Sequence, residues 1–348
     1  MQDMKDNKQL FGGSVVLIGG DWKQLTPVVP KGNPEAVIDA SIKKWDEYDH
    51  CKQIELKKNM RVNEDEIDFI QELKHIGNGD TEGYSNYIKG TDYIKVDEEN
   101  IAKNALDLMN FCYEPQWLAE PEKYAKELCG SAILCPTNTV VKRLNQKVLN
   151  NLSGRQQKTF FARNTPLGDQ PLNALTDNET EYSIEAMEKI ETAGMPPHEL
   201  NLKNGAIVML IKNISVNTGL CNGTRMQITE IFDDCIKCKV LSGSRSDNSD
   251  EIFLPRCKFE YGGTPSEPGI HFSRCQFPVK LSFAMSINKS QGQTLQKVGI
   301  YLRQGECFSH GQLYTAMSRV RTKKSIKIVT AVLDTNNVKN VVWKQLLD

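Results

Sequence analysis

The segment SAILCPTNTVVKRLNQKVLNNLSG, residues 131–154, predicts a buried strand followed directly by a helix. Residues 131–135 are a short apolar run ended by Pro136, which is typical of a strand covered on both faces. Asn138 then opens a helix whose apolar stripe is Val141, Leu144, Val148 and Leu152, with Gly154 beyond it. A buried strand joined to an amphipathic helix is the repeating unit of an α/β domain.

The same alternation recurs on both sides of this segment. Downstream, the sequence predicts strands at 279–284, 298–302 and 325–329, a helix at 310–317 and a terminal helix. Upstream, it predicts a buried strand at 14–18, a strand at 51–56, and helices at 33–48, 64–75, 102–111 and 121–128. Because the apolar run 14–18 needs neighbouring strands on both sides, we expect part of the complete protein to precede Met1.

The pattern changes at about residue 181. Short strands are predicted at 206–211, 225–231, 235–241 and 251–254, separated by turns rich in Gly, Asn and Ser. This pattern is typical of a small antiparallel barrel. The sequence therefore predicts an α/β fold in which a doubly wound domain is interrupted by a β-rich insertion, with segments 1–50, 51–180, 181–277 and 278–348.

The composition is that of a soluble globular protein. Of the 348 residues, 39% are hydrophobic and 25% are charged. No apolar run is long enough to span a bilayer, and residues 1–10 lack the apolar core of a secretory signal. Ten cysteines without such a signal predict reduced thiols in an intracellular protein.

The net charge of −1 conceals a basic stretch between residues 274 and 327. Its one acid is Glu306, and its basic residues are Arg274, Lys280, Lys289, Lys297, Arg303, Arg319, Arg321, Lys323, Lys324 and Lys327. A local excess of this kind can attract a polyanion, and the alternative is a solvated basic face without a ligand.

Four polar loops adjoin the predicted strands, where ligands bind in open α/β sheets. Gln24 could hold a phosphate oxygen or a water, or could belong to an ordinary Gly-rich turn. Arg61 follows a strand in a polar loop, and Arg319 ends a helix; the alternative for a lone arginine is a surface charge. The loop 288–294 offers side chains that can hydrogen-bond phosphates, and Gly292 would let a ligand approach closely.

Six segments resemble, in order, the Pif-type DNA helicases of superfamily 1B, especially the branch found in Helitron-like transposable elements. They are GGDWKQLTPVV (19–29), LKKNMRV (56–62), AILCPTNTVVKRLNQKVL (132–149), LKNGAIVMLIKNISVNTGLCNGTRMQI (202–228), FPVKLSFAMSINKSQGQTL (277–295) and FSHGQLYTAMSRVR (308–321). The resemblance covers nearly the whole chain. It implies a second RecA-like P-loop NTPase motor domain with an inserted small SH3-like β-barrel, preceded by the tail of a first RecA-like domain.

The resemblance also implies roles for particular residues. Gln24 would sense the γ-phosphate of ATP, and Arg61 and Arg319 would be arginine fingers that stabilise charge on the transferred phosphoryl group. Gln291 and Gly292 would lie near the nucleotide. The backbone of single-stranded DNA would be held by Thr137, Asn138, Asn288, Lys289 and Ser290. Family members often have His at the position of Asn288 and Phe at that of Trp22.

The implied function is ATP-dependent movement on single-stranded or forked DNA in the 5′-to-3′ direction, with ATP and Mg²⁺ as cofactors of the complete protein and the nucleus as its compartment. No GxxxxGK[ST] loop occurs in the sequence, and no strand ending in Asp-Glu precedes Gly12. We expect both to lie upstream in the complete protein, and the isolated chain to lack ATPase activity. The alternatives are a non-catalytic, single-strand-binding helicase remnant and a decayed transposon product without a stable fold.

Two further features are expected to be structural. Cys235 and Cys238 have the spacing of half a zinc site, with Cys257 and Cys275 as candidate partners, but the surrounding strand pattern favours ordinary strand residues. His310 is expected to pack at a helix start rather than to bind a ligand.

Overall fold

A computed structural model describes residues 2–30, 32–80, 84–167, 184–192, 194–241, 251–262, 271–333 and 335–347. The helices are α1 Gln2–Lys5, α2 Pro34–Asp39, α3 Ile67–Asn78, α4 Ala105–Cys112, α5 Pro115–Ala119, α6 Ala125–Gly130, α7 Asn138–Asn150, α8 Ile184–Lys189 and α9 Gln312–Met317. The strands are β1 Tyr93–Lys95, β2 Ser131–Cys135, β3 Lys158–Phe161, β4 Arg163–Pro166, β5 Glu199–Leu202, β6 Ile207–Leu210, β7 Arg225–Ile231, β8 Cys235–Val240, β9 Glu251–Pro255, β10 Cys257–Tyr261, β11 Phe272–Gln276, β12 Val279–Leu281, β13 Ala284–Ser286, β14 Lys297–Tyr301, β15 Ile326–Val329 and β16 Asn337–Lys339.

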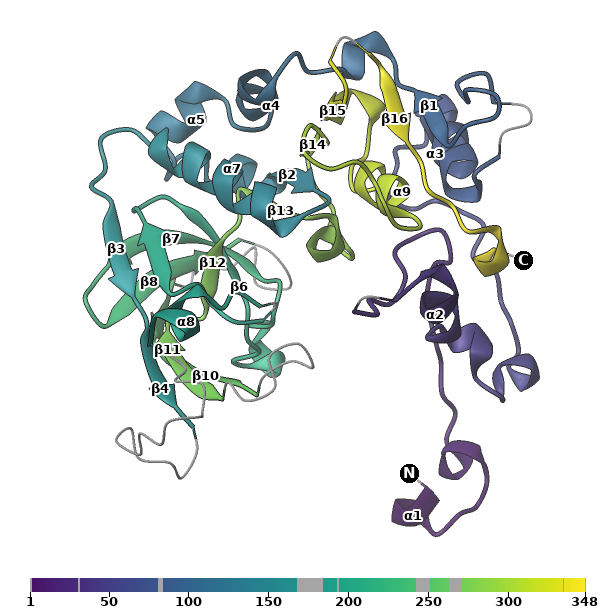
Figure 1. The fold of residues 1–348 in the computed structure, drawn as a ribbon, viewed down its shortest axis with the longest axis horizontal. Helices are drawn as coiled ribbons and strands as arrows, with labels where there is room; N and C mark the ends of the chain where they lie inside the picture. Colours follow the sequence, from purple (N-terminus) through teal and green to yellow (C-terminus); the bar gives the residue numbers. More distant parts are fainter. Residues whose placement is uncertain are drawn as a thin grey trace, which may run out of the picture.

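A four-stranded parallel sheet forms the centre of the molecule (Figure 1). Its order is β13-β2-β14-β15, so the first strand in sequence lies inside the sheet and later strands add on both of its sides. All five residues of β2 are buried, as the apolar run at 131–135 predicts. The predicted parallel strand and the helix that follows it are both confirmed.

Helices cover both faces of this sheet, because the side chains of β2 alternate between two cores. Ile133 and Cys135 pack in one core with α4 and α7, whereas Ala132 and Leu134 pack in the other with α3 and α9. The α7 stripe contributes Leu144 and Val148 as predicted, together with Val140 and Leu149. This arrangement confirms the doubly wound α/β domain.

The strands β3 to β12 form a β-rich region on one side of the parallel sheet (Figure 1). Its largest sheet is antiparallel, in the order β12-β6-β7-β8-β9, and smaller sheets have the orders β10-β11-β4 and β3-β5. These pairings join the strands at 158–166 to the β-rich region, for which the sequence predicts the bounds 181–277. The predicted boundary between residues 180 and 181 lies outside the described residues.

The prediction of one strand at 279–284 is wrong. The structure has two strands there: β12 pairs with β6 in the antiparallel sheet, and β13 pairs with β2 in the parallel sheet. Ser282 and Phe283 connect them, and both are buried. A continuous apolar run cannot reveal this change of sheet, because both halves are buried and extended.

The predicted strands at 14–18 and 51–56 are also wrong. Neither segment has regular structure, and Val15 is 100% exposed and Leu56 92% exposed. An apolar extended segment becomes a strand only when another strand accepts its hydrogen bonds, and no described residue pairs with these segments. The predicted helix at 33–48 is reduced to α2 and two short 3₁₀ turns, Ile42–Lys44 and Tyr48–His50.

The C-terminal end differs from the predicted helix as well. It forms β16, which pairs antiparallel with β1, followed by the 3₁₀ turn Lys344–Leu346. The helices at 64–75 and 310–317 are confirmed as α3 and α9, and Gly79 ends α3 in the left-handed conformation. Within the described part of the chain, no helix combines the length and apolar character needed to cross a membrane.

Candidate functional site

Adjacent parallel strands bring residues that the resemblance assigns to DNA binding to the same edge of the sheet. Cys135 of β2 is in register with Ser286 of β13, so the residues after these strands emerge side by side. Thr137 and the exposed Asn138 begin α7 after β2, and the exposed Asn288 and Lys289 follow β13.

The loop 287–296 is held by its own hydrogen bonds. The Ser290 hydroxyl is buried and donates to the carbonyl of Ile287 at 2.7 Å, so this side chain supports the loop instead of facing solvent. The Gln293 amide donates to the carbonyl of Lys289 at 3.1 Å. Gly292 has a φ of +79°, and a Cβ at this position would meet no atom within 4 Å, which leaves its backbone open to a ligand.

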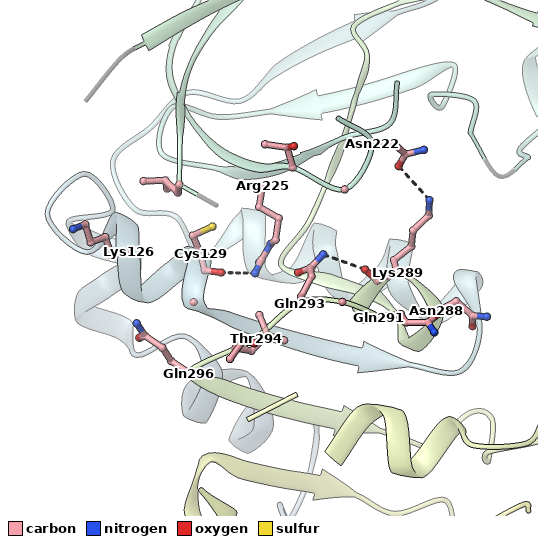
Figure 2. A pocket seen from close by; sticks show the side chains of 16 residues that line it. Lys126, Cys129, Asn222, Arg225, Asn288, Lys289, Gln291, Gln293, Thr294 and Gln296 are labelled. Atoms are coloured by element: carbon pink, nitrogen blue, oxygen red, sulfur yellow. Dashed lines mark hydrogen bonds between the residues drawn. The ribbon is translucent and has the colours of Figure 1, made fainter. Parts of the chain in front are cut away.

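A polar cavity of about 1000 Å³ lies between this loop and the β-rich region (Figure 2). None of the described residues that line it is acidic. They are Lys126, Cys129, Gly130, Asn222, Gly223, Thr224, Arg225, Leu241, Asn288, Lys289, Gln291, Gly292, Gln293, Thr294, Leu295 and Gln296. Lysine and amide side chains without carboxylates favour an anionic, hydrogen-bonding ligand. Thr137 and Asn138 do not line this cavity, although they lie at the neighbouring strand end.

Arg61 and Arg319 lie together on the other side of the same loop. Arg61 donates to the Thr294 hydroxyl at 3.2 Å and to the Ser318 carbonyl at 2.9 Å. Arg319 is fully buried and donates to the Thr315 carbonyl and the Ser318 hydroxyl, each at 2.8 Å. Burial and, second, the charge of Arg61 lower the pKa of Arg319 to about 10. A bound anion would oppose this lowering, because a nearby negative charge favours the charged guanidinium.

Gln24 lies in the segment that faces these arginines, but its amide is bound to Asp21. Gln24 donates to the Asp21 carboxylate at 2.9 Å, and the Tyr314 hydroxyl donates to the same carboxylate at 3.2 Å. Burial and the charge of Asp21 raise the pKa of Tyr314, and the Asp21 charge also acts on Arg319. Sequence reasoning missed Asp21 and Tyr314. Asp21 could have been found from its proximity to Gln24 in the chain, whereas nothing in the sequence around Tyr314 marks that residue.

The segment 21–24 docks on the start of α9. His310 is buried and bonds through Nε2 to the Trp22 carbonyl at 2.7 Å, while its Nδ1 accepts from the Trp343 amide at 2.8 Å. Since Nδ1 is the acceptor, the neutral ring carries its proton on Nε2. His310 is therefore a packing residue, as predicted. Gly311 has a φ of +69°, and a Cβ there would lie 2.4 Å from the carbonyl oxygen of Lys23.

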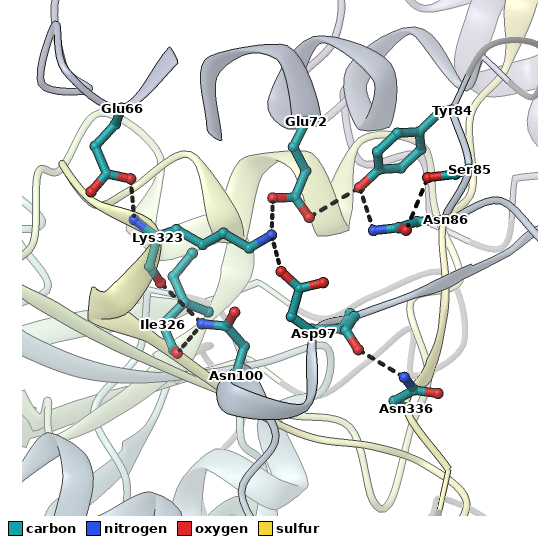
Figure 3. A network of polar contacts seen from close by, with 11 residues as sticks. Glu66, Glu72, Tyr84, Ser85, Asn86, Asp97, Asn100, Lys323, Ile326 and Asn336 are labelled. Atoms are coloured by element: carbon teal, nitrogen blue, oxygen red, sulfur yellow. Dashed lines mark hydrogen bonds and ion pairs between the residues drawn. The ribbon is translucent and has the colours of Figure 1, made fainter. Parts of the chain in front are cut away.

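A partly buried polar network connects the elements that carry the two arginines (Figure 3). The Lys323 ammonium lies 2.6 Å from both Glu72 of α3 and Asp97, and Tyr84 donates to Glu72 at 3.0 Å. Burial alone would lower the pKa of Lys323, but hydrogen bonds to Asp97 and Glu72 outweigh it, so that the pKa is raised. Because Arg61 precedes α3 and Arg319 precedes Lys323, this network fixes the two arginine-bearing segments relative to each other.

The basic stretch at 274–327 is only partly available to a polyanion. Arg274 and Arg319 are buried, and Lys297 and Lys323 form ion pairs with acidic side chains. Lys289 is exposed and its ammonium lies 3.3 Å from the Asn222 side chain across the cavity. Charge counting along the sequence therefore overstates the basic surface.

The cysteine spacing at 235–238 does not make a metal site. Both residues lie in β8, where side chains three positions apart point to opposite faces; Cys238 is buried and Cys235 is half-buried. In the part of the chain that the structure describes, no three His, Cys, Asp or Glu side chains gather in an arrangement that could hold a metal ion.

Comparison with known proteins finds similarity to one family of helicases. The profile described as "PIF1-like helicase" matches residues 1–86, and the one described as "DNA helicase Pif1, 2B domain" matches residues 185–231. The chain is 25% identical over 338 residues to the ATP-dependent DNA helicase PIF1 of Danio rerio, covering 94% of this chain and 42% of that protein. The chain is therefore similar to the Pif1-like helicases over most of its length.

Two other similarities agree with this finding. The human ATP-dependent DNA helicase PIF1 is 37% identical over 140 residues, which cover 37% of this chain and 19% of that protein. The crystal structure of Bacteroides Pif1 bound to ssDNA superposes with a TM-score of 0.61 at 23% identity, covering 99% of this chain and 68% of that one.

The Pif1 likeness confirms the predicted RecA-like α/β helicase fold. The chain spans about two fifths of the length of the curated Pif1 relatives that it matches over most of its own length. The Helitron-like branch, the SH3-like character of the β-rich region and the role of each site residue stay predictions.

Proposed function

We propose that this chain is the part of an ATP-dependent, 5′-to-3′ DNA helicase that contains the second motor domain and binds single-stranded DNA. One observation carries the proposal: the loop 287–296 contacts Arg61 and Arg319 on one side, and on the other it lines a polar cavity whose described lining residues include no acid. A single loop that touches both sites can couple nucleotide state to DNA binding. The direction of movement rests on the family resemblance alone.

The described residues fit the terminal phosphate of ATP. Arg61 and Arg319 both donate hydrogen bonds to Ser318, and Gln24 lies in the segment that docks on the start of α9. In the complete protein these arginines stabilise negative charge on the transferred phosphoryl group, and Gln24 exchanges its bond to Asp21 for one to the γ-phosphate. Gln291 and Gly292, which the resemblance places near the nucleotide, lie on the same loop but line the cavity that we assign to DNA. The described residues do not fit Mg²⁺, because no group of three or more His, Cys, Asp or Glu side chains among them could hold a metal ion.

On the DNA side, the exposed side chains of Asn138, Asn288 and Lys289 bind the phosphate backbone of a single strand. Backbone contacts of this kind dominate affinity and make it depend on salt. The relatives support this assignment, since one structure in the family is described as bound to ssDNA and another as unwinding forked dsDNA. A DNA-processing role also favours the nucleus as the compartment of the complete protein.

The second candidate function is a single-strand-binding helicase remnant without turnover. The absence of a GxxxxGK[ST] loop from these 348 residues favours it for the isolated chain. Both candidates require DNA binding and differ in whether the complete protein hydrolyses ATP.

Fluorescence anisotropy with a labelled oligo-dT across a salt series tests the proposal. We expect affinity to fall steeply as salt rises, and Lys289→Ala to weaken binding and reduce the salt slope by about 0.7, the value for one lost phosphate contact on a single strand. Lys324→Ala, an exposed lysine outside the cavity, is the matched control. Binding that is indifferent to salt, or equal effects of the two variants, would overturn the proposal.

A further inference from the structure

Arg225 is a fully buried cation at the junction between the β-rich region and the parallel sheet. Only 1% of it is exposed, although it lies at the start of β7 beside the polar cavity. Its guanidinium donates to the Ser131 carbonyl at 3.0 Å and to the Ser282 carbonyl at 2.6 Å. It also donates to the Ser282 hydroxyl at 3.2 Å and to the Cys129 carbonyl (Figure 2).

These acceptors belong to two segments of the chain that meet at the junction. Cys129 is in the last turn of α6, Ser131 begins β2, and Ser282 is in the connection through which the chain passes from β12 to β13. A guanidinium is planar and rigid, so its donors fix the directions of the groups that they bind. Arg225 therefore helps to fix the orientation of the β-rich region against the sheet, in addition to the apolar core that the two parts share.

The orientation matters because the two parts form opposite walls of the cavity. The turn that leads into β7 supplies Asn222, and the loop after β13 supplies Lys289, whose ammonium lies 3.3 Å from the Asn222 oxygen. A rotation of the β-rich region about the connection at Ser282 would separate these walls. Gln227, two residues along β7, adds a second bond to the motor domain by donating to the Pro121 carbonyl at 2.7 Å.

We infer that Arg225 is a positioning residue that holds the β-rich region over the cavity and thereby sets the affinity for single-stranded DNA without contacting it. The inference rests on the proposed function for its DNA readout. If substitution leaves only a tenth of the molecules in the binding-competent orientation, the apparent affinity falls about tenfold. The number of phosphate contacts stays the same, so the salt slope is unchanged.

The experiment compares Arg225→Met and Arg225→Lys with Arg256→Met in the full chain. Arg256 is a matched control because it lies in the same β-rich region and binds Phe161 and Gln276 there, away from the motor domain. Hydrogen exchange is followed at two amides. Ile133 bonds to Phe283 at the junction, and Ile228 bonds to Ala206 within the β-rich region.

For Arg225→Met we expect faster exchange at Ile133, unchanged exchange at Ile228, and about tenfold weaker oligo-dT binding with an unaltered salt slope. Arg225→Lys should restore part of the affinity. Three results would each overturn the inference: equal acceleration at both amides, unchanged exchange at Ile133, or a salt slope reduced as in Lys289→Ala. If Arg225→Met does not fold, Arg225→Lys decides by the same three criteria.

The two exchange readouts need no DNA. Wild-type protein that fails to bind oligo-dT would therefore refute the proposed function, while the exchange data still decide whether Arg225 orients the β-rich region.

Discussion

Replacing Gly311 by alanine should detach the segment 21–24 from α9. Gly311 begins α9 with a φ of +69°, a conformation that costs an L-residue about 1–2 kcal/mol. The new Cβ would also lie 2.4 Å from the Lys23 oxygen and 2.6 Å from the Gln24 oxygen, distances that real Cβ atoms essentially never show. Both obstacles are backbone atoms, so no side-chain rotation can relieve them.

The two effects set the expected loss of stability. Overpacking of this kind costs about 1–3 kcal/mol, and together with the left-handed backbone the free energy of unfolding should fall by about 2–5 kcal/mol. The overpacking part has an upper limit, because the segment can release from α9 and remove the clash. The loss of stability beyond the cost of the left-handed backbone therefore measures the free energy with which the segment 21–24 docks on α9.

Urea unfolding followed by tryptophan fluorescence measures this loss of stability. Trp22 and Trp343 both hydrogen-bond to His310, where the segment 21–24 contacts the start of α9. Gly154→Ala is the matched control: its φ is +67°, and its Cβ would meet no atom within 4 Å. We expect the control to lose only about 1–2 kcal/mol. If the two alanine variants lose equal stability, the segment 21–24 contributes no docking energy, and the geometry around Gln24 and Arg319 needs another explanation.

Three further predictions concern the polar network around Lys323, the contact of His310 with the segment 21–24, and ATP turnover. Lys323→Met should lower the free energy of unfolding by about 2–3 kcal/mol in a urea titration, because it leaves Glu72 buried without its cation. Burial lowers the pKa of His310 below its ordinary 6.5. The stabilisation of the folded state by neutral His310 is therefore fully present above pH 6.5 and is lost as pH falls from 6.5 through the folded-state pKa. His310→Gln should abolish this acid dependence in unfolding measurements. The isolated chain should release no phosphate from ATP. A folded fusion to the N-terminal part of a Pif1 relative should instead show DNA-stimulated ATP turnover. Arg61→Ala or Arg319→Ala should lower this turnover about 10³-fold, with little change in nucleotide affinity.

Each of these predictions has a control and a contrary result. Lys324→Met changes an exposed neighbour of Lys323. If it lowers the free energy of unfolding as much as Lys323→Met does, the polar network around Lys323 does not stabilise the fold. For His310, the control is His50→Gln at an exposed histidine, and an unchanged acid dependence in His310→Gln would refute the assignment. Turnover by the isolated chain would contradict its expected lack of ATPase activity, and undiminished turnover by a fusion lacking both arginines would show that the arginine roles are wrong.

The sequence by itself determined the elements whose pattern is local. The run 131–135 and the helix after it are recognisable because burial on both faces and helical spacing are written within a few residues. The order of six motifs likewise sufficed to predict the RecA-like fold. The helix α3 and its glycine end were predictable for the same reason.

Pairing between distant segments decided the rest. The apolar runs 14–18 and 51–56 have strand-like composition, but a strand exists only where a neighbour accepts its hydrogen bonds. The run 279–284 is divided between two sheets because β6 and β2 compete for its halves. Nothing local marks this division, since both halves are apolar and extended.

The candidate site shows the same contrast. Gln24, Arg61 and Arg319 stand out in short polar motifs, and the loop 288–294 stands out by composition. The bond from Tyr314 to Asp21 joins residues 293 positions apart, and Arg225 reaches carbonyls that no pattern in β7 announces. Tertiary structure alone made these contacts, because the acceptors are backbone groups or side chains whose positions depend on how the two sheets and the N-terminal segment come together.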